Sequence, residues 1–203
     1  PEIESITDLQ KNEIQGTLSK FFNGGERPLV LFGAGVGLAD QEDCVIRFIE
    51  SNNLPFVSSW NGMNFFTHKH KNYYGNIGVY GNRGANFILQ SSDRLLVLGS
   101  RLDNRQRGNV KKFAANANVL VMDIDQGELN KHKNNENHIM IQLDFSNLHR
   151  ILDNLNLNLG LNAHWYEFNT KVKDKYFTHW PSSSAKKYGS LSPYDVVKKI
   201  NSL

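Results

Sequence analysis

The side chains best suited to chemistry in this sequence follow a short apolar run, Leu95–Leu98. Arg101, Asp103 and Arg105 stand at alternate positions after it, among further amide and cationic residues. A guanidinium binds a phosphate or carboxylate through two parallel hydrogen bonds and keeps its charge at any working pH. The cluster therefore suits the binding of an anionic ligand such as a diphosphate. Alternatively, Arg101 could serve only as a structural ion-pair partner of Asp103 or Asp123.

The apolar run predicts where this cluster lies in the fold. Four apolar residues without alternation are typical of a strand buried on both faces of a parallel sheet. Residues directly after such a strand lie at the carboxyl edge of the sheet, where α/β folds bind ligands. Three glycines upstream, Gly78, Gly81 and Gly84, let the backbone approach a ligand or another chain segment closely.

Apolar runs alternate with helical patterns along the chain. The expected strands cover 28–32, 54–57, 95–98, 119–122 and 138–141. Strands separated by helices pair in parallel through crossovers. We therefore expect an α/β fold, a doubly wound parallel sheet of five or six strands, Rossmann-like and of the FAD/NAD-binding type. The runs 28–32 and 95–98 should be central, and the tract 65–74 is expected to be an exposed loop.

A glycine-rich segment, Gly33–Gly37, follows the first strand and leaves two interpretations open. Its free amides and the next helix could hold a diphosphate, or its glycines could serve only a tight turn. A standard NAD site is excluded because Leu38 replaces the small residue of the dinucleotide fingerprint. The second strand is also followed by Ser58-Ser59-Trp60, without the acid that would bind the ribose.

Composition narrows the function classes. The 203 residues are 39% hydrophobic and carry a net charge of +3, with lysines spread among acids and asparagines. Neither a nucleic-acid-binding stripe nor a membrane span is indicated. His68 and His70 lack nearby acids or cysteines, so a metal site there is not expected. The single cysteine, Cys44, is expected to be a buried, inert thiol, which fits a reducing cytoplasm.

The segments around the central strand resemble the central domain of thiamine-diphosphate-dependent enzymes, most closely those of acetolactate synthase type. The matching features occur in the family's order. They are Gly78-x-x-Gly81, Ala85-Asn86, Gln90, Ser92-Asp93, the apolar strand, and Gly99-x-Arg101-x-Asp103-x-Arg105.

This resemblance implies an FAD or ADP-like site at the carboxyl edge. Trp60-Asn61-Gly62 corresponds to the family loop along the flavin nucleotide, and Asp123 to the Asp-x-Asp segment that faces the adenosine. Asp144 matches the family's Gly-Asp turn, although Leu143 replaces the glycine. The predicted cofactor-binding residues are Gly33, Gly35, Trp60, Asn61, Gly62, Gly78, Gly81, Arg101, Asp123 and Asp144. Asp125, with Glu128 three residues on, and Asp144 could instead cap helices. No catalytic residue or metal ligand is predicted.

The resemblance also implies a domain division. Residues 1–26 are expected to be an N-terminal linker and helix, 27–155 the central domain, and 156–203 a linker and the start of a C-terminal domain. Within the last segment we expect a helix at 163–177 and another that begins after its N-cap, Ser192. The expected apolar side of the first helix consists of Trp165, Phe168, Val172 and Tyr176. Thiamine diphosphate and Mg²⁺ would bind the parent enzyme but not this chain, which lacks any Asp-Gly pair and hence the family's cofactor signature. The expected partners are the N- and C-terminal domains of a homo-oligomeric parent, and the chain alone is not expected to be active.

Two other classes remain as alternatives. A sirtuin-like NAD-dependent deacylase shares a Gly-Ala-Gly loop, but its usual four-cysteine zinc site cannot be built from one cysteine. A ligand-free α/β interaction module differs from the leading interpretation only in whether a nucleotide binds.

Overall fold

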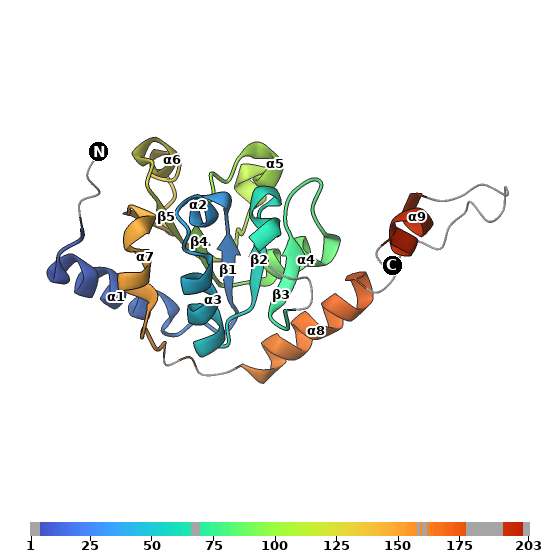
Figure 1. Cartoon of the computed structure of the whole chain (residues 1–203), viewed down its shortest axis with the longest axis horizontal. Coiled ribbons are helices and arrows are strands. Elements are labelled where there is room, and N and C mark those ends of the chain that lie inside the picture. Colours follow the sequence, from blue (N-terminus) through green and yellow to red (C-terminus); the bar gives the residue numbers. More distant parts are fainter. Residues whose placement is uncertain (1–4, 66–69, 158, 160–161, 178–192, 201–203) are drawn as a thin grey trace.

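A six-stranded parallel sheet forms the centre of the molecule (Figure 1). The computed structural model describes residues 5–65, 70–157, 159, 162–177 and 193–200. The strand order is β3-β2-β1-β4-β5-β6, and every neighbouring pair is parallel. The strands are β1 Pro28–Phe32, β2 Phe56–Ser58, β3 Tyr73–Asn76, β4 Arg94–Leu98, β5 Asn118–Asp123 and β6 His138–Gln142. The predicted fold class, with β1 and β4 central, is confirmed.

Helices cover both faces of the sheet. They are α1 Asp8–Phe22, α2 Ala34–Leu38, α3 Glu42–Ser51, α4 Arg83–Ser91, α5 Asn104–Arg107, α6 Gln126–Asn130, α7 Leu148–Leu152, α8 Ala163–Phe177 and α9 Pro193–Ile200, with 3-10 turns η1 Trp60–Phe65, η2 Val110–Lys112 and η3 Phe145–Asn147. One core cluster joins α1, α3 and α7 to one face of the sheet. A second joins α4, α6 and α8 to the other face. The layers therefore alternate as a doubly wound fold requires.

The strand patterns explain this burial. All five residues of β1 are buried, and its side chains alternate between the two clusters, with Val30 and Phe32 on one face and Leu29 and Leu31 on the other. The buried side of α3 includes Cys44, as predicted for this residue. Burial, followed by the nearby carboxylate of Asp153, raises the pKa of the Cys44 thiol to about 12. The thiol is therefore protonated at neutral pH and unreactive.

The edge strand β3 corrects the expectation of an exposed loop at 65–74. Tyr73 and Tyr74 are buried, and the Tyr73 hydroxyl lies 2.8 Å from Ser58 Oγ on β2. The segment Tyr-Tyr-Gly-Asn has a mixed strand preference, because tyrosine favours strands whereas glycine and asparagine do not. Its pairing with β2 is what makes it a strand. The expected exposure of His68 concerns a residue outside the described part of the chain.

The helix α8 packs onto the same core as the sheet. The Trp165 indole Nε1 donates a hydrogen bond of 2.9 Å to the Pro28 carbonyl at the start of β1. Trp165 and Val172 are buried, and Phe168 stacks on Trp165 at 5.5 Å between ring centroids. The predicted helix and its apolar side are thus confirmed, while the domain division at residue 155 stays a prediction. A helix also begins at Pro193, and its expected cap, Ser192, lies outside the described residues.

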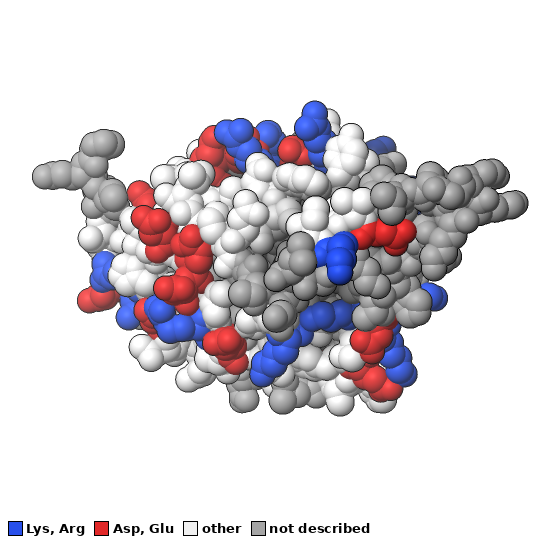
Figure 2. Space-filling model, turned by 45° about the vertical axis from the view of Figure 1, so that its right-hand side comes forward, with Lys and Arg blue, Asp and Glu red and all other residues white. Residues whose placement is uncertain are grey.

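Charged side chains are mixed over the surface. Figure 2 shows lysines and arginines interspersed with acidic residues on the face that it presents. Within the described ranges, no helix has the length and apolarity that a membrane span requires.

Candidate functional site

All the predicted site residues lie at the carboxyl edge of the sheet. Each follows or ends a strand, and six parallel strands point their carboxyl ends to the same edge, where α2, α5 and α6 lie (Figure 1). Gly33 and Gly35 follow β1, Trp60–Gly62 follow β2, and Gly78 and Gly81 follow β3. Arg101 follows β4, Asp123 ends β5, and Asp144 follows β6. This common edge is the candidate functional site.

The first glycine segment turns directly after β1 into the short helix α2, with Gly33 at its N-cap. A Cβ atom on Gly33 would lie 2.1 Å from the Gly99 carbonyl oxygen, and one on Gly35 would lie 2.9 Å from Gly99 Cα. Their amides already donate to the carbonyls of Leu98 and Gly99, at 2.8 and 2.9 Å. Glycine is required here because two backbones pack together after β1 and β4, and these two amides are not free for an anion.

The segment after β2 presents side chains next to α2. Trp60 is 58% exposed and Asn61 is also exposed, at the start of η1. Gly62 is buried, and a Cβ atom there would lie 2.7 Å from the Phe32 carbonyl oxygen at the end of β1. Gly62 thus holds the turn against β1, while Trp60 and Asn61 face outward at the candidate site.

The loop after β3 is hydrogen-bonded to two helices, α4 and α5. Gly78 has φ +110°, and its amide and carbonyl both bond the Asn86 side chain on α4 at 2.9 Å. The Val79 amide donates to the Arg105 carbonyl at 2.8 Å. A Cβ atom on Gly81 would clash with the Ile77 backbone at 2.3 Å, so this turn also needs glycine.

Arg101 supplies a cation at this edge, but its partner differs from both expected partners. Its side chain is 76% exposed, and Nε lies 3.7 Å from Oε1 of Glu128 on α6. Asp103 instead caps α5 by accepting from the Arg105 and Gln106 amides. Such a long ion pair with an exposed guanidinium contributes little to stability. Glu128 is largely buried and also pairs with Lys131, so Arg101 can exchange Glu128 for a ligand at low cost.

The aspartates of this edge hold turns together. Asp123 is buried and accepts from the Asp125 amide at 3.0 Å, and burial raises the pKa of its carboxyl group. Asp125 caps α6 through the Gly127 and Glu128 amides, as the capping interpretation predicted. Asp144 accepts from the Ser146 amide at 2.9 Å and caps η3.

Exposed apolar side chains other than Trp60, which was a predicted site residue, are the feature that sequence reasoning missed here. Large apolar residues stand outside the core at four of these strand ends. They are Leu38 (87% exposed), Trp60, Val79, Tyr80 (73% exposed) and Ile124. The available signal was an apolar residue placed just after a strand rather than within it. Together with Arg101 they make an edge that can pack on another surface or stack on a planar ring.

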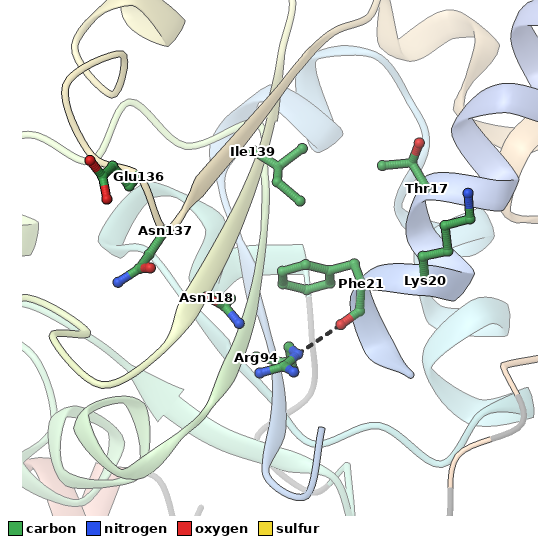
Figure 3. Close-up of a pocket in the computed structure, with 8 residues that line it drawn as sticks. All are labelled: Thr17, Lys20, Phe21, Arg94, Asn118, Glu136, Asn137 and Ile139. Atoms are coloured by element: carbon green, nitrogen blue, oxygen red, sulfur yellow. Dashed lines mark hydrogen bonds between the residues drawn. The ribbon is translucent and has the colours of Figure 1, made fainter. Parts of the chain in front are cut away.

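A pocket of about 390 Å³ lies at the opposite, amino edge of the sheet (Figure 3). It is enclosed by the α1 residues Thr17, Lys20 and Phe21 and by the starts of β4, β5 and β6. The Arg94 Nε atom donates to the Phe21 carbonyl at 2.8 Å, the bond drawn in Figure 3. Arg94 therefore anchors α1 to the sheet, and the pocket shares none of the predicted site residues.

Comparison with known proteins identifies the family. The family described as "Thiamine pyrophosphate enzyme, central domain" matches residues 17–151. The acetolactate synthase large subunit of Lactococcus lactis is 30% identical over 200 residues, which is 98% of this chain and 33% of that protein. The isozyme 2 large subunit of Escherichia coli is 32% identical over 123 residues, 61% of this chain and 22% of that protein.

The probable large subunit of Methanococcus aeolicus is 32% identical over 115 residues, 57% of this chain and 19% of that protein. The chain thus spans about a fifth to a third of the length of these curated relatives. The predicted central domain covered residues 27–155, and the family match over residues 17–151 covers nearly the same part of the chain. The chain belongs to the family of thiamine pyrophosphate enzyme central domains, of the acetolactate synthase type.

Proposed function

We propose that this chain serves as the central domain of an enzyme that decarboxylates a 2-oxo acid and joins the product to a second carbonyl. The observation that carries the proposal is the family match over residues 17–151, together with relatives named acetolactate synthase large subunits. Thiamine diphosphate, bound by other domains of that enzyme, would stabilise the carbanion formed on decarboxylation. Mg²⁺ would hold its diphosphate there.

The domain's own contribution would be scaffold and interdomain contact. The apolar side chains Leu38, Val79, Tyr80 and Ile124 support this role, because they are exposed together at the carboxyl edge. Large exposed apolar side chains at one edge of a domain are the kind of surface that a partner can cover. The N- and C-terminal domains of the same enzyme are the partners that we propose for it.

An FAD or ADP-like nucleotide at this edge is the second part of the proposal. Arg101 would pair with the diphosphate, and Trp60 or Tyr80 would stack on a ring of the nucleotide. The nucleotide would contact these exposed side chains rather than the Gly33 and Gly35 amides, because both amides already donate hydrogen bonds to backbone carbonyls. A bound flavin could accept electrons, but decarboxylation with carbon–carbon bond formation is redox-neutral, so we assign it a structural role.

A ligand-free interaction module is the second candidate. The bonded amides of Gly33 and Gly35 favour it, since they remove the usual diphosphate-binding element after the first strand. In that case the carboxyl edge would bind only neighbouring protein surface, and Arg101 would remain with Glu128.

Calorimetric titration of the chain with FAD and ADP separates these candidates. For nucleotide binding we expect Arg101→Ala to weaken the affinity roughly ten- to a hundredfold, because a charge-assisted hydrogen bond is lost. Arg47→Ala is the matched control, since Arg47 is an exposed cation on α3 that pairs with Asp153. No binding to the unaltered chain, or equal binding by both variants, would favour the ligand-free module.

We also expect no carbon dioxide release from pyruvate or 2-oxobutyrate by the 203-residue chain with thiamine diphosphate and Mg²⁺ added. The chain contains no Asp-Gly pair and so lacks the cofactor signature of the family. Release above a protein-free blank would show that the chain carries catalytic machinery of its own.

A further inference from the structure

A second cavity, of about 510 Å³, lies beside β6 between the segments that connect β4 to β5 and β5 to β6. We call it the basic pocket, and define it by Arg107, Lys111, Lys131, His132, Glu136 and His138. None of the predicted carboxyl-edge residues lines it. Glu136, with Asn137, also lines the amino-edge pocket, so this segment separates the two cavities (Figure 3).

The charge of the basic pocket is predominantly positive. Three permanent cations, Arg107, Lys111 and Lys131, line it against one carboxylate, Glu136. Lys131 pairs with Glu128 of α6. The Arg107 Nε atom is buried and has no hydrogen-bond partner among the described residues. A buried donor without an acceptor costs free energy, which an anion in the pocket would recover once the Arg107 side chain turns Nε toward it.

The hydrogen bonds of the pocket determine its histidine tautomers. Asn135 Oδ1 accepts from the Asn137 amide at 3.1 Å, so Asn135 Nδ2 donates to His138 Nε2 at 2.9 Å. Neutral His138 then carries its proton on Nδ1 and donates to His132 Nδ1, 3.0 Å away. Neutral His132 must therefore hold its proton on Nε2, as a donor.

The electrostatic surroundings keep this pair neutral. Burial, then His138, then Arg107 and Lys131 lower the pKa of His132 to about 4, and Glu128 acts weakly against them. Burial and then Arg107 lower the pKa of His138 as well. The cations repel a proton on either imidazole, and an anion bound among them would reduce that repulsion. Proton uptake by the pair and anion binding should therefore favour each other.

We propose that the basic pocket binds a phosphate monoester, with the phosphoryl oxygens accepting from Arg107 and Lys111 and the organic group lying along Val110 and Phe113. Bidentate arginine pairing matches the geometry of a phosphoryl group. The volume falls within the roughly 300–1,000 Å³ that is typical of small-molecule sites, which leaves room for an organic substituent. The proposal does not depend on the carboxyl-edge nucleotide, because the two sites share no residue.

Histidine-detected NMR on the full chain in a phosphate-free buffer at pH 7.5 tests it. Phenyl phosphate, methyl phosphate and succinate are titrated separately. We expect saturable shifts of the His132 and His138 imidazole signals, tightest for phenyl phosphate. Arg107→Gln should weaken binding roughly ten- to a hundredfold. Arg105→Gln, on the same short helix but outside the pocket lining, should leave it unchanged.

Lys111→Gln and its neighbour Lys112→Gln, which does not line the pocket, form a second matched pair if Arg107→Gln fails to fold. Phenyl phosphate binding that Lys111→Gln weakens and Lys112→Gln does not would support the site. The proposal is overturned if no ligand gives a saturable shift of either histidine, or if the lining and control variants weaken binding equally. Succinate binding as tightly as phenyl phosphate would overturn the phosphate assignment.

Discussion

Acid should destabilise this domain through His132, and the structure sets the size of the effect. His132 is 4% exposed, and burial, followed by His138 and then the neighbouring cations, lowers its pKa to about 4 from 6.5. The unfolded chain therefore binds more protons between these values, so stability is lost as pH falls through this window. For one such group, the free energy of unfolding should drop by about 2 kcal/mol between pH 7 and pH 5.

Urea unfolding of the unaltered chain and of His132→Gln, at pH 7 and pH 5, isolates this contribution. Other groups contribute to the pH dependence, including His138 in the same direction, whose pKa is lowered chiefly by burial. The difference between the two proteins removes the effects of groups that do not contact His132, and it assigns to His132 any change that the substitution causes at its partner His138. We expect His132→Gln to lose about 2 kcal/mol less than the unaltered chain on acidification. The buffer must be phosphate-free, because a bound anion would oppose the effect.

His149→Gln is the matched control, since His149 is an exposed histidine on α7. Its unfolding should have the same pH dependence as that of the unaltered chain. The reasoning would be refuted if His132→Gln and the unaltered chain lost equal stability between pH 7 and pH 5. An NMR titration that places the His132 pKa near 6.5 would refute it independently.

Three further substitutions test the packing by urea unfolding at neutral pH. Gly33→Ala should lower the free energy of unfolding by at least about 3 kcal/mol, because the new Cβ would lie 2.1 Å from a backbone oxygen. Its control, Gly16→Ala, lies in open space within α1 and should raise the free energy of unfolding by up to about 1 kcal/mol. Equal effects of the two substitutions would contradict the close packing at Gly33. Asn52→Ala should lower the free energy of unfolding by about 3 kcal/mol, since the buried Asn52 side chain hydrogen-bonds the carbonyls of Phe48 and Leu155 and the Leu157 amide. Its control, Asn156→Ala, is at an exposed position and should change the free energy of unfolding by no more than about 0.5 kcal/mol. Trp165→Phe should cost about 1–3 kcal/mol by leaving a β1 carbonyl unpaired, and no loss would show that α8 does not hold the sheet.

Local patterns in the sequence were sufficient for most of the fold. The apolar runs at β1 and β4 predicted two central parallel strands, because a strand covered on both faces has no polar side to alternate. The stripe of Trp165, Phe168 and Val172 predicted α8 with its bounds. Asp125 and Asp144 were recognisable as caps, since a cap depends only on residues two or three positions away.

The features that sequence reasoning missed depend on contacts between distant residues. β3 becomes a strand only by pairing with β2, and Gly33 is required by a contact with Gly99, 66 positions further along the chain. Arg101 pairs with Glu128 rather than with either nearby aspartate, because Asp103 and Asp123 already accept local backbone amides. The basic pocket needed two crossover segments placed side by side. The sequence by itself thus determined the elements and their order, whereas burial and long-range packing in the tertiary structure decided which polar groups remain available for ligands.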